Sequence, residues 1–172
     1  MGLSHADKIL KVNHAGEHGA VNIYRGQRLV CFWRDEELKR DLEEFRAHEE
    51  RHRAIFAAEL ERRGVRRCRS YWLCGLGGFL LGITTGICGR ASIAAVTVAV
   101  ERVVLRHLEQ QLRELEGVDA AAHAAVTSIL DDERAHHDHA AQETRQGIFW
   151  PRILRPTVSA ATEFVIWTGM KF

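Results

Sequence analysis

The 172-residue chain has little proline, few cysteines and almost no net charge. Because it has only two prolines, long uninterrupted helices are possible. The four cysteines form no C-x-x-C pair and have no zinc-like spacing with histidines, which favours free thiols in a reducing compartment over a zinc site. A formal net charge of +1 disfavours a nucleic-acid-binding protein, so we expect no nucleic acid partner.

Targeting and dinucleotide-binding signals are also missing. The first residues lack the apolar run of a signal peptide and the Arg/Ser-rich character of a transit peptide, which favours a cytoplasmic location. The Gly-x-Gly at Gly75 and Gly77 has Leu80 where a dinucleotide fingerprint needs its third glycine. With 46% hydrophobic residues, the chain suits one compact domain over residues 1–172.

What the chain does contain is one pattern that occurs twice: a glutamate, then a Glu-x-x-His 32 positions later (49 − 17 and 133 − 101). The second copy begins 84 positions after the first (101 − 17). A single Glu-x-x-His is weak evidence for a metal site, but two copies at one spacing are strong evidence. The six residues are Glu17, Glu49 and His52 in the first copy, and Glu101, Glu133 and His136 in the second.

The acids of this repeat fall on apolar faces of predicted helices. Around Glu49, the positions three, four or seven residues away include Leu42, Phe45 and Phe56. A buried carboxylate costs several kcal/mol unless it is paired, protonated or bound to a metal. Four carboxylates and two imidazoles in one core therefore indicate two metal ions, and this is the ligand set of di-iron and di-manganese carboxylate bundles. Ligand type alone does not separate iron from manganese.

Periodicity and glycine stops predict four long helices, over about residues 4–33, 35–63, 91–116 and 119–146, with Asp119 as the N-cap of the fourth. The predicted fold class is all-α: a ferritin-like four-helix bundle with a long apolar crossover and an additional C-terminal helix over residues 148–172. We expect this last helix to lie at a membrane interface; the alternative is that it only covers the bundle.

The crossover, residues 65–90, includes 19 uncharged residues from Tyr71 to Gly89, which is near the length that crosses a bilayer. A spanning segment here would put the two copies of the repeat on opposite sides of the membrane, so the metal site could not assemble. Its six glycines also weaken a continuous helix. We therefore predict a broken crossover that contacts the membrane without spanning it.

Four stretches of the chain carry a family resemblance: VNHAGEHGAVNIYRGQ, HEERH, TVAVE and DDERAHHD. The sequence resembles the demethoxyubiquinone hydroxylase family, membrane-associated di-iron monooxygenases of ubiquinone biosynthesis, over nearly its whole length. It differs from the family pattern at His18, where the family often has tyrosine, and at Arg102, where a second acid often follows the ligand. We expect these differences to affect substrate preference more than metal binding.

The resemblance implies the activity: hydroxylation of the ring of a polyprenylated demethoxyquinone with O2, by two Fe ions per chain and with electrons from NADH. It implies that the six repeat residues are the metal ligands and that His107 lies near them. From the general bundle pattern, Glu49 and Glu133 are the expected bridges, and Glu17 and Glu101 the terminal ligands. The implied location is peripheral, at a membrane lipid surface: the cytoplasmic face of the inner membrane, or the matrix side of the mitochondrial inner membrane in a eukaryote. Other ubiquinone biosynthesis proteins are further expected partners.

Three alternatives stay open at this stage. A ferritin-like ferroxidase or iron-binding protein uses a similar ligand set, and so does a dimanganese catalase, but a long uncharged crossover is a liability in a soluble protein. A metal-free helical scaffold leaves four acids on apolar stripes unexplained. Side chains that orient the ligands cannot be ranked from sequence. The candidates are His14, His18, His48, Asp131, Asp132, His137, Asp138 and His139, while Tyr24 and Arg25 are assigned to packing and surface.

Overall fold

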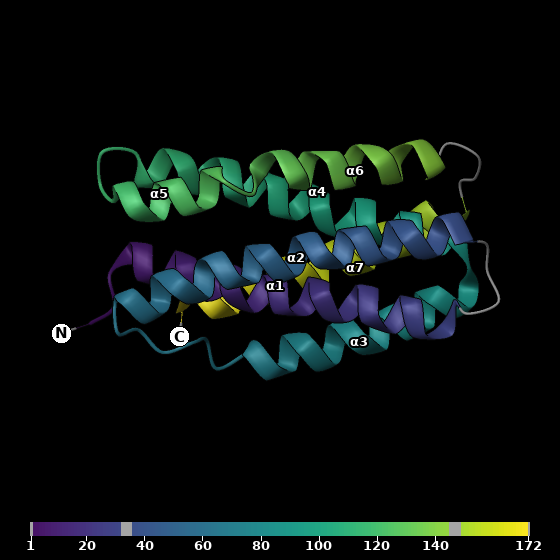
Figure 1. Cartoon of the computed structure of the whole chain (residues 1–172), viewed down its shortest axis with the longest axis horizontal. Coiled ribbons are helices and arrows are strands. Elements are labelled where there is room, and N and C mark those ends of the chain that lie inside the picture. Colours follow the sequence, from purple (N-terminus) through teal and green to yellow (C-terminus); the bar gives the residue numbers. More distant parts are fainter. Residues whose placement is uncertain (1, 32–35, 145–148, 172) are drawn as a thin grey trace.

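The structure, a computed structural model, describes residues 2–31, 36–144 and 149–171. Every regular element in these ranges is a helix, which confirms the predicted all-α class (Figure 1). The helices are α1 (His5–Val30), α2 (Glu36–Arg62), α3 (Tyr71–Cys88), α4 (Arg90–Leu115), α5 (Ala120–Thr127), α6 (Leu130–Thr144) and α7 (Phe149–Lys171).

Four long elements form the bundle: α1, α2, α4 and the pair α5–α6. Helix α1 packs on α2, and α4 packs on α6, so each copy of the repeat supplies one antiparallel hairpin. A capping box begins α1, in which Ser4 and Asp7 each accept a hydrogen bond from the other's backbone N–H. The Asp119 carboxylate accepts a hydrogen bond from the Ala122 N–H, as the predicted N-cap requires. The predicted helix ends at Trp33, Asp35 and Gln146 lie outside the described residues.

The fourth predicted helix is wrong in one respect, because it is broken in two. Helix α5 ends at Thr127 and α6 begins at Leu130. The Thr127 hydroxyl donates a hydrogen bond to the His123 carbonyl, and the Ser128 hydroxyl donates one to the Ala125 carbonyl. Such hydroxyls compete with the helix's own N–H groups for carbonyls, which accounts for a bend here. The break precedes the first turn of α6, which carries Glu133.

The prediction of a broken crossover is also wrong, because α3 is one continuous helix that runs beside α1 (Figure 1). Its buried glycines face α1 so closely that a Cβ on Gly78 would overlap the Gly19 carbonyl, and one on Gly82 would overlap the Ile23 carbonyl. Glycine therefore allows a close helix contact here, and the packing outweighs its low helix propensity. The opposite face of α3 exposes Trp72, Leu73, Leu76, Leu80 and Ile87.

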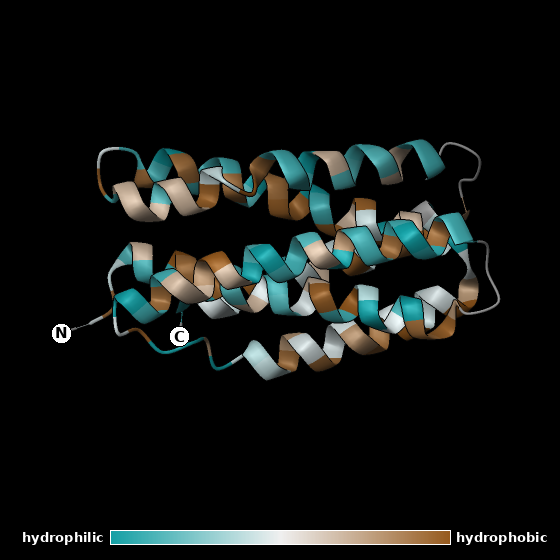
Figure 2. Cartoon of the chain, in the orientation of Figure 1, coloured by the Kyte–Doolittle hydropathy of each residue, from teal (hydrophilic) through white to brown (hydrophobic). Residues whose placement is uncertain are grey.

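Helix α7 packs on α4 as α3 packs on α1, so each half of the molecule has a third helix packed against its first. Leu81 of α3, and Leu154 and Val158 of α7, pack in one cluster with Val96 and Ala99 of α4. Helix α3 is coloured white to brown over most of its length, whereas α6 is mostly teal (Figure 2). Helix α7 also leaves large apolar side chains exposed. These are Phe149, Ile153, Phe164 and Trp167.

The largest apolar cluster fills the bundle between the buried Glu and His residues of the repeat and the α4–α5 turn. Phe56 and Leu60 from α2 meet Leu108 and Leu115 from α4 there, and Ile129 joins them between α5 and α6. Four of these five side chains are at most 2% exposed and Leu60 is 3% exposed, so the hairpins are held together next to the site. Helix α3 is the one described helix that is long and apolar enough to cross a membrane, and only 33% of it is buried.

Candidate metal centre

The six repeat residues come together inside the bundle from four helices. Glu17 is on α1, Glu49 and His52 are on α2, Glu101 is on α4, and the second Glu-x-x-His is on α6. None is more than 6% exposed. The i, i+3 spacing of Glu-x-x-His puts both side chains on one helix face, which is why each motif points inward as a unit.

The donor atoms form two overlapping groups, within each of which they lie no more than 4.8 Å apart. One group consists of Glu17, Glu49, His52 and Glu133, and the other of Glu49, Glu101, Glu133 and His136. Glu49 and Glu133 belong to both groups. Each group joins one imidazole to three carboxylates, a donor set that suits iron or manganese.

Several of these buried atoms have no hydrogen-bond partner. They are both carboxylate oxygens of Glu49, one of Glu133, and the Nδ1 atoms of His52 and His136. His52 Nδ1 lies 2.9 Å from Glu133 Oε1 and His136 Nδ1 lies 3.1 Å from Glu49 Oε1, but without hydrogen-bond geometry. Unpartnered buried polar atoms are rare because each is costly. Their convergence fits metal ions between them.

The pKa values of the clustered side chains also indicate that the site binds cations. Burial raises the pKa of Glu17 and of Glu101 well above the usual value, and the neighbouring carboxylates raise both further. Burial raises the pKa of Glu49 as well, but the His136 and His52 rings outweigh it and bring that pKa to about 2. Burial lowers the pKa of His52, yet Glu133 and Glu49 raise it to about 11. Without a metal ion, the site must therefore bind protons in place of cations.

The structure ranks the candidates for orienting the ligands. Asp132 Oδ2 lies 3.0 Å from His52 Nε2, and His48 Nδ1 lies 3.0 Å from His136 Nε2. Each ligand histidine thus bonds one neighbour on the opposite hairpin through the nitrogen that faces away from the cluster. Such bonds fix the ring orientation of metal-binding histidines. Sequence reasoning listed both residues without ranking them.

The other candidates lie elsewhere. His107 is outside both donor groups: its Nε2 is 2.8 Å from Glu163 of α7, and the same carboxylate binds Arg106. His18 stacks on Tyr71 of α3 at a centroid distance of 3.9 Å. His137 bonds Asp138 near the surface.

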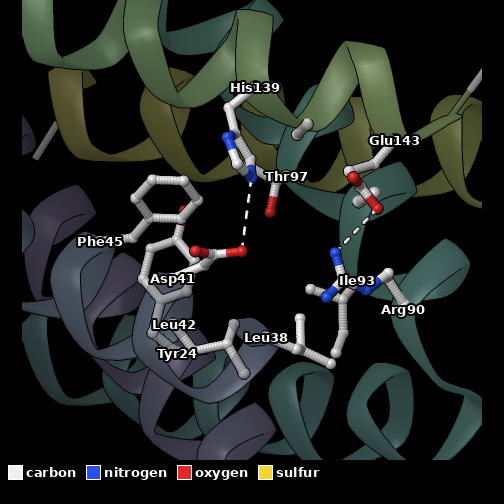
Figure 3. Close-up of a pocket in the computed structure, with 12 residues that line it drawn as sticks. Tyr24, Leu38, Asp41, Leu42, Phe45, Arg90, Ile93, Thr97, His139 and Glu143 are labelled. Atoms are coloured by element: carbon white, nitrogen blue, oxygen red, sulfur yellow. Dashed lines mark hydrogen bonds and ion pairs between the residues drawn. The ribbon is translucent and has the colours of Figure 1, made fainter. Parts of the chain in front are cut away.

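A mainly apolar pocket, with two ion pairs among its lining residues, opens beside the site between α1, α2, α4 and α6 (Figure 3). His139 Nε2 lies 3.6 Å from Asp41 Oδ2, and Arg90 Nη1 lies 3.1 Å from Glu143 Oε2 across its mouth. Its cavity of about 30 Å³ has room for one or two waters. Phe45 lines the pocket and packs on the His136 ring at 4.6 Å, so the pocket adjoins the ligand layer.

A second recess lies between α1 and α4. Ala20, Ile23 and Tyr24 line one side, Val96 and Val100 the other, and Thr97 and Glu101 complete it. Tyr24 is only 2% exposed and packs in an apolar cluster, in agreement with its assignment to packing, and it lines both the first pocket and this recess. The recess is therefore an apolar approach to one of the clustered carboxylates.

Comparison with known proteins identifies a family and several relatives that are named as hydroxylases. The family model described as Ubiquinone biosynthesis protein COQ7 matches residues 4–169. The 3-demethoxyubiquinol 3-hydroxylases of Rhodospirillum rubrum and Ralstonia pickettii are 32% and 34% identical over 95% and 92% of this chain, and over 76% and 71% of their own lengths. The NADPH-dependent 3-demethoxyubiquinone 3-hydroxylase, mitochondrial, of Rattus norvegicus is 28% identical over 96% of this chain and 77% of its own length. The chain belongs to the COQ7 family of ubiquinone biosynthesis proteins.

Proposed function

We propose that this protein is a di-iron monooxygenase that hydroxylates the ring of a polyprenylated demethoxyquinone in ubiquinone biosynthesis. Membership of the family and the names of the relatives support the hydroxylation step and a quinone substrate. The observation that carries the metal assignment is the convergence of six buried carboxylate and imidazole side chains with unpartnered donor atoms. The bound ions are iron, two for each chain.

The chain's own residues have distinct roles in this proposal. Glu49 and Glu133, which belong to both donor groups, would be the ligands that the two ions share, while Glu17 and Glu101 would each hold one ion. His52 would hold one ion and His136 the other, each through the Nδ1 atom that faces the clustered carboxylates. When bound, the iron pair supplies the redox chemistry that activates dioxygen. The buried ligand layer excludes bulk water from the reaction, since the six side chains are at most 6% exposed.

The quinone ring reaches the centre through the recess between α1 and α4, while its polyprenyl tail stays in the lipid. The recess ends at Glu101 and is flanked by the α3 and α7 helices, whose exposed apolar side chains contact the membrane surface. Its cavity is only about 10 Å³, whereas small-molecule pockets occupy ~300 Å³ or more. Ring entry therefore requires side chains at this recess, or the α3 and α7 helices, to move apart.

Electrons come from a reduced nicotinamide, with NADH as the expected donor; the rat relative is named NADPH-dependent. The protein is peripheral, on the cytoplasmic face of the inner membrane in a bacterium or the matrix side in a mitochondrion. The apolar exposed face of α3 supports a membrane-surface location, and the mitochondrial designation of the rat relative supports the mitochondrion as the compartment in a eukaryote. Other proteins of ubiquinone biosynthesis bind it there.

A single-turnover experiment tests the activity. The protein is loaded with ferrous iron without oxygen, mixed with a demethoxyquinol in detergent micelles, and exposed to 18O2. Mass analysis of the extracted quinone is expected to show a gain of one 18O atom. The Glu49→Ala/Glu133→Ala variant is the matched control, and it should give unchanged quinone.

The same experiment distinguishes storage chemistry. A ferroxidase oxidises its iron rapidly whether or not quinone is present, and it leaves the quinone mass unchanged. That result, obtained with protein that holds two iron ions, would contradict the proposed hydroxylation. An 18O gain that persists in the double variant would instead contradict the assigned metal centre.

A further inference from the structure

The internal repeat continues one residue upstream of each Glu-x-x-His, and there its two copies differ in charge. His48 precedes Glu49, and Asp132 precedes Glu133, so the two residues occupy equivalent positions 84 apart (132 − 48). Each bonds the ligand histidine of the opposite hairpin at 3.0 Å. One copy of the repeat therefore presents a neutral imidazole where the other presents a carboxylate.

The positions of the protons follow from the geometry. His52 and His136 both turn Nδ1 toward the clustered carboxylates, so Nδ1 is the nitrogen that binds a metal ion in the proposed function. The remaining ring nitrogen, Nε2, then carries the proton and donates it in a hydrogen bond. Asp132 accepts that bond at His52 with a carboxylate oxygen. His48 accepts it at His136 with Nδ1 and must itself be a neutral ring protonated at Nε2.

We propose that His48 and Asp132 are positioning residues that make the two metal positions unequal, the ion on His52 being held more tightly than the ion on His136. A carboxylate acceptor draws the N–H proton and makes the opposite ring nitrogen a stronger donor to a metal, whereas a neutral acceptor does so less. This inference rests on the metal centre assigned above, and it adds an order of binding to the ions.

Two features of the site limit the size of the difference. Arg51 Nη2 lies 3.4 Å from the same Asp132 oxygen that His52 contacts, and it offsets part of that negative charge. The Asp132 side chain is also 38% exposed, so water screens it. Changes in outer partners of metal ligands alter affinity by ~10–100-fold, and we expect the lower end of that range here.

Titration of the metal-free protein with Co²⁺ in a calorimeter tests this order, because Co²⁺ stands in for Fe²⁺ without reacting with air. Wild type is expected to bind two ions with dissociation constants about tenfold apart. His48→Asp should tighten the weaker site about tenfold and bring the two constants together. Asp132→Asn, which keeps the shape and removes the charge, should weaken the tighter site about tenfold.

Conservative variants separate acceptor strength from folding. His48→Gln retains a neutral acceptor and should keep both wild-type constants, whereas His48→Leu removes the acceptor and should weaken only the weaker site. Asp131→Asn is the matched control for Asp132, because its side chain is 96% exposed and lies beside the site without contacting a ligand. Thermal unfolding of each metal-free variant shows whether a change in affinity comes from loss of fold; if His48→Asp fails to fold, Asp132→Asn carries the test.

The outcomes keep the two proposals apart. Two Co²⁺ ions bound with equal constants in wild type, or constants that do not move in His48→Asp and Asp132→Asn, would overturn the inequality and leave the metal centre standing. A wild-type protein that binds no Co²⁺ and no Fe²⁺ would overturn the metal centre itself. The proposal is supported if wild type has unequal dissociation constants, if the weaker site tightens to match the stronger one in His48→Asp, and if the tighter site weakens to match the other in Asp132→Asn.

Discussion

The two halves of the molecule, α1–α3 and α4–α7, share the arrangement of the six clustered Glu and His residues and differ in the shape of the helices around them. Both present a glutamate on one helix, a Glu-x-x-His on the next and an apolar third helix packed outside. The first half has an unbroken α2 and a glycine-faced α3, whereas the second has a broken α5–α6 pair and Pro156 inside α7. The clustered Glu and His residues have the same spacing along the chain in both halves, whereas the helices that carry them differ in continuity and in glycine and proline content.

Removal of the clustered glutamates should have the largest effect on the two halves, because each half is expected to lose its metal ion separately. Glu17→Ala removes a ligand that belongs only to the His52 group, and Glu101→Ala removes one that belongs only to the His136 group. Each should retain one tightly bound iron, while Glu49→Ala/Glu133→Ala should retain none because both ions lose their shared ligands. Metal analysis of protein reconstituted without oxygen measures this. If Glu17→Ala and Glu101→Ala lose both ions as readily as the double variant, the division into two half-sites is wrong.

The outer helices are compared through membrane binding. Leu76 and Leu80 are 59% and 56% exposed on α3, and Phe164 is 64% exposed on α7. Burial of one such side chain contributes ~1.5–3 kcal/mol, so Leu76→Ser/Leu80→Ser should weaken binding to lipid vesicles at least tenfold. Phe164→Ser should weaken it less, since it removes one side chain. Vesicle co-sedimentation measures both, with unfolding temperatures as the control. Unchanged binding in the double variant would contradict a membrane role for α3.

The close contact of α3 with α1 has no equivalent row of glycines in α7. A Cβ on Gly82 would meet the Ile23 carbonyl of α1, so Gly82→Ala should destabilise the fold by ~1–3 kcal/mol. Gly77 has open space around it in the same helix, so Gly77→Ala should stabilise the fold by ~0.5–1 kcal/mol. Urea unfolding of the metal-free protein compares the two. Equal effects would mean that helix propensity, not packing, sets the stability of α3.

An ion pair between the C-terminal end of α2 and the N-terminus of α5 joins the two halves. Arg63, just past α2, donates hydrogen bonds of 2.7 and 2.8 Å to Asp119, the N-cap of α5. The Arg63 guanidinium holds the pKa of Asp119 at about 2, below its usual 3.8. Because this carboxyl has a lower pKa in the folded state than in the unfolded state, its ionisation stabilises the fold above about pH 4. That stabilisation is lost as the pH falls toward 2. Asp119→Ala should therefore cost ~1 kcal/mol at pH 7, as N-cap losses do, and much less near pH 2.

The measurement is urea unfolding of wild type and Asp119→Ala at pH 7 and at low pH. Asp119→Asn is the control, since it keeps an N-cap acceptor without the charge. A difference between wild type and Asp119→Ala that stays constant down to pH 2 would show that the pair with Arg63 adds no stability and that Asp119 acts only as the N-cap of α5.

The bundle and the convergence of the six side chains follow from the sequence because the repeat and the apolar spacing report the same helix faces. The hydrogen-bond partners of His52 and His136 could not be predicted from the sequence, because these bonds connect residues that are 80 and 88 positions apart. A signal was nevertheless present: extending the repeat by one residue pairs His48 with Asp132. The break after Thr127 depends on hydroxyl-to-carbonyl bonds that leave little trace in sequence. The continuity of α3 was missed because glycine propensity describes an isolated helix, while α3 is stabilised by contact with α1.

The most direct test of the central claim is a crystal of the protein grown with Fe²⁺ under nitrogen and measured at the iron absorption edge. The account predicts two anomalous peaks per chain, ~3.5–4 Å apart, with Glu49 and Glu133 touching both and each histidine touching one through Nδ1. A single peak, or peaks that lie away from these six side chains, would contradict it.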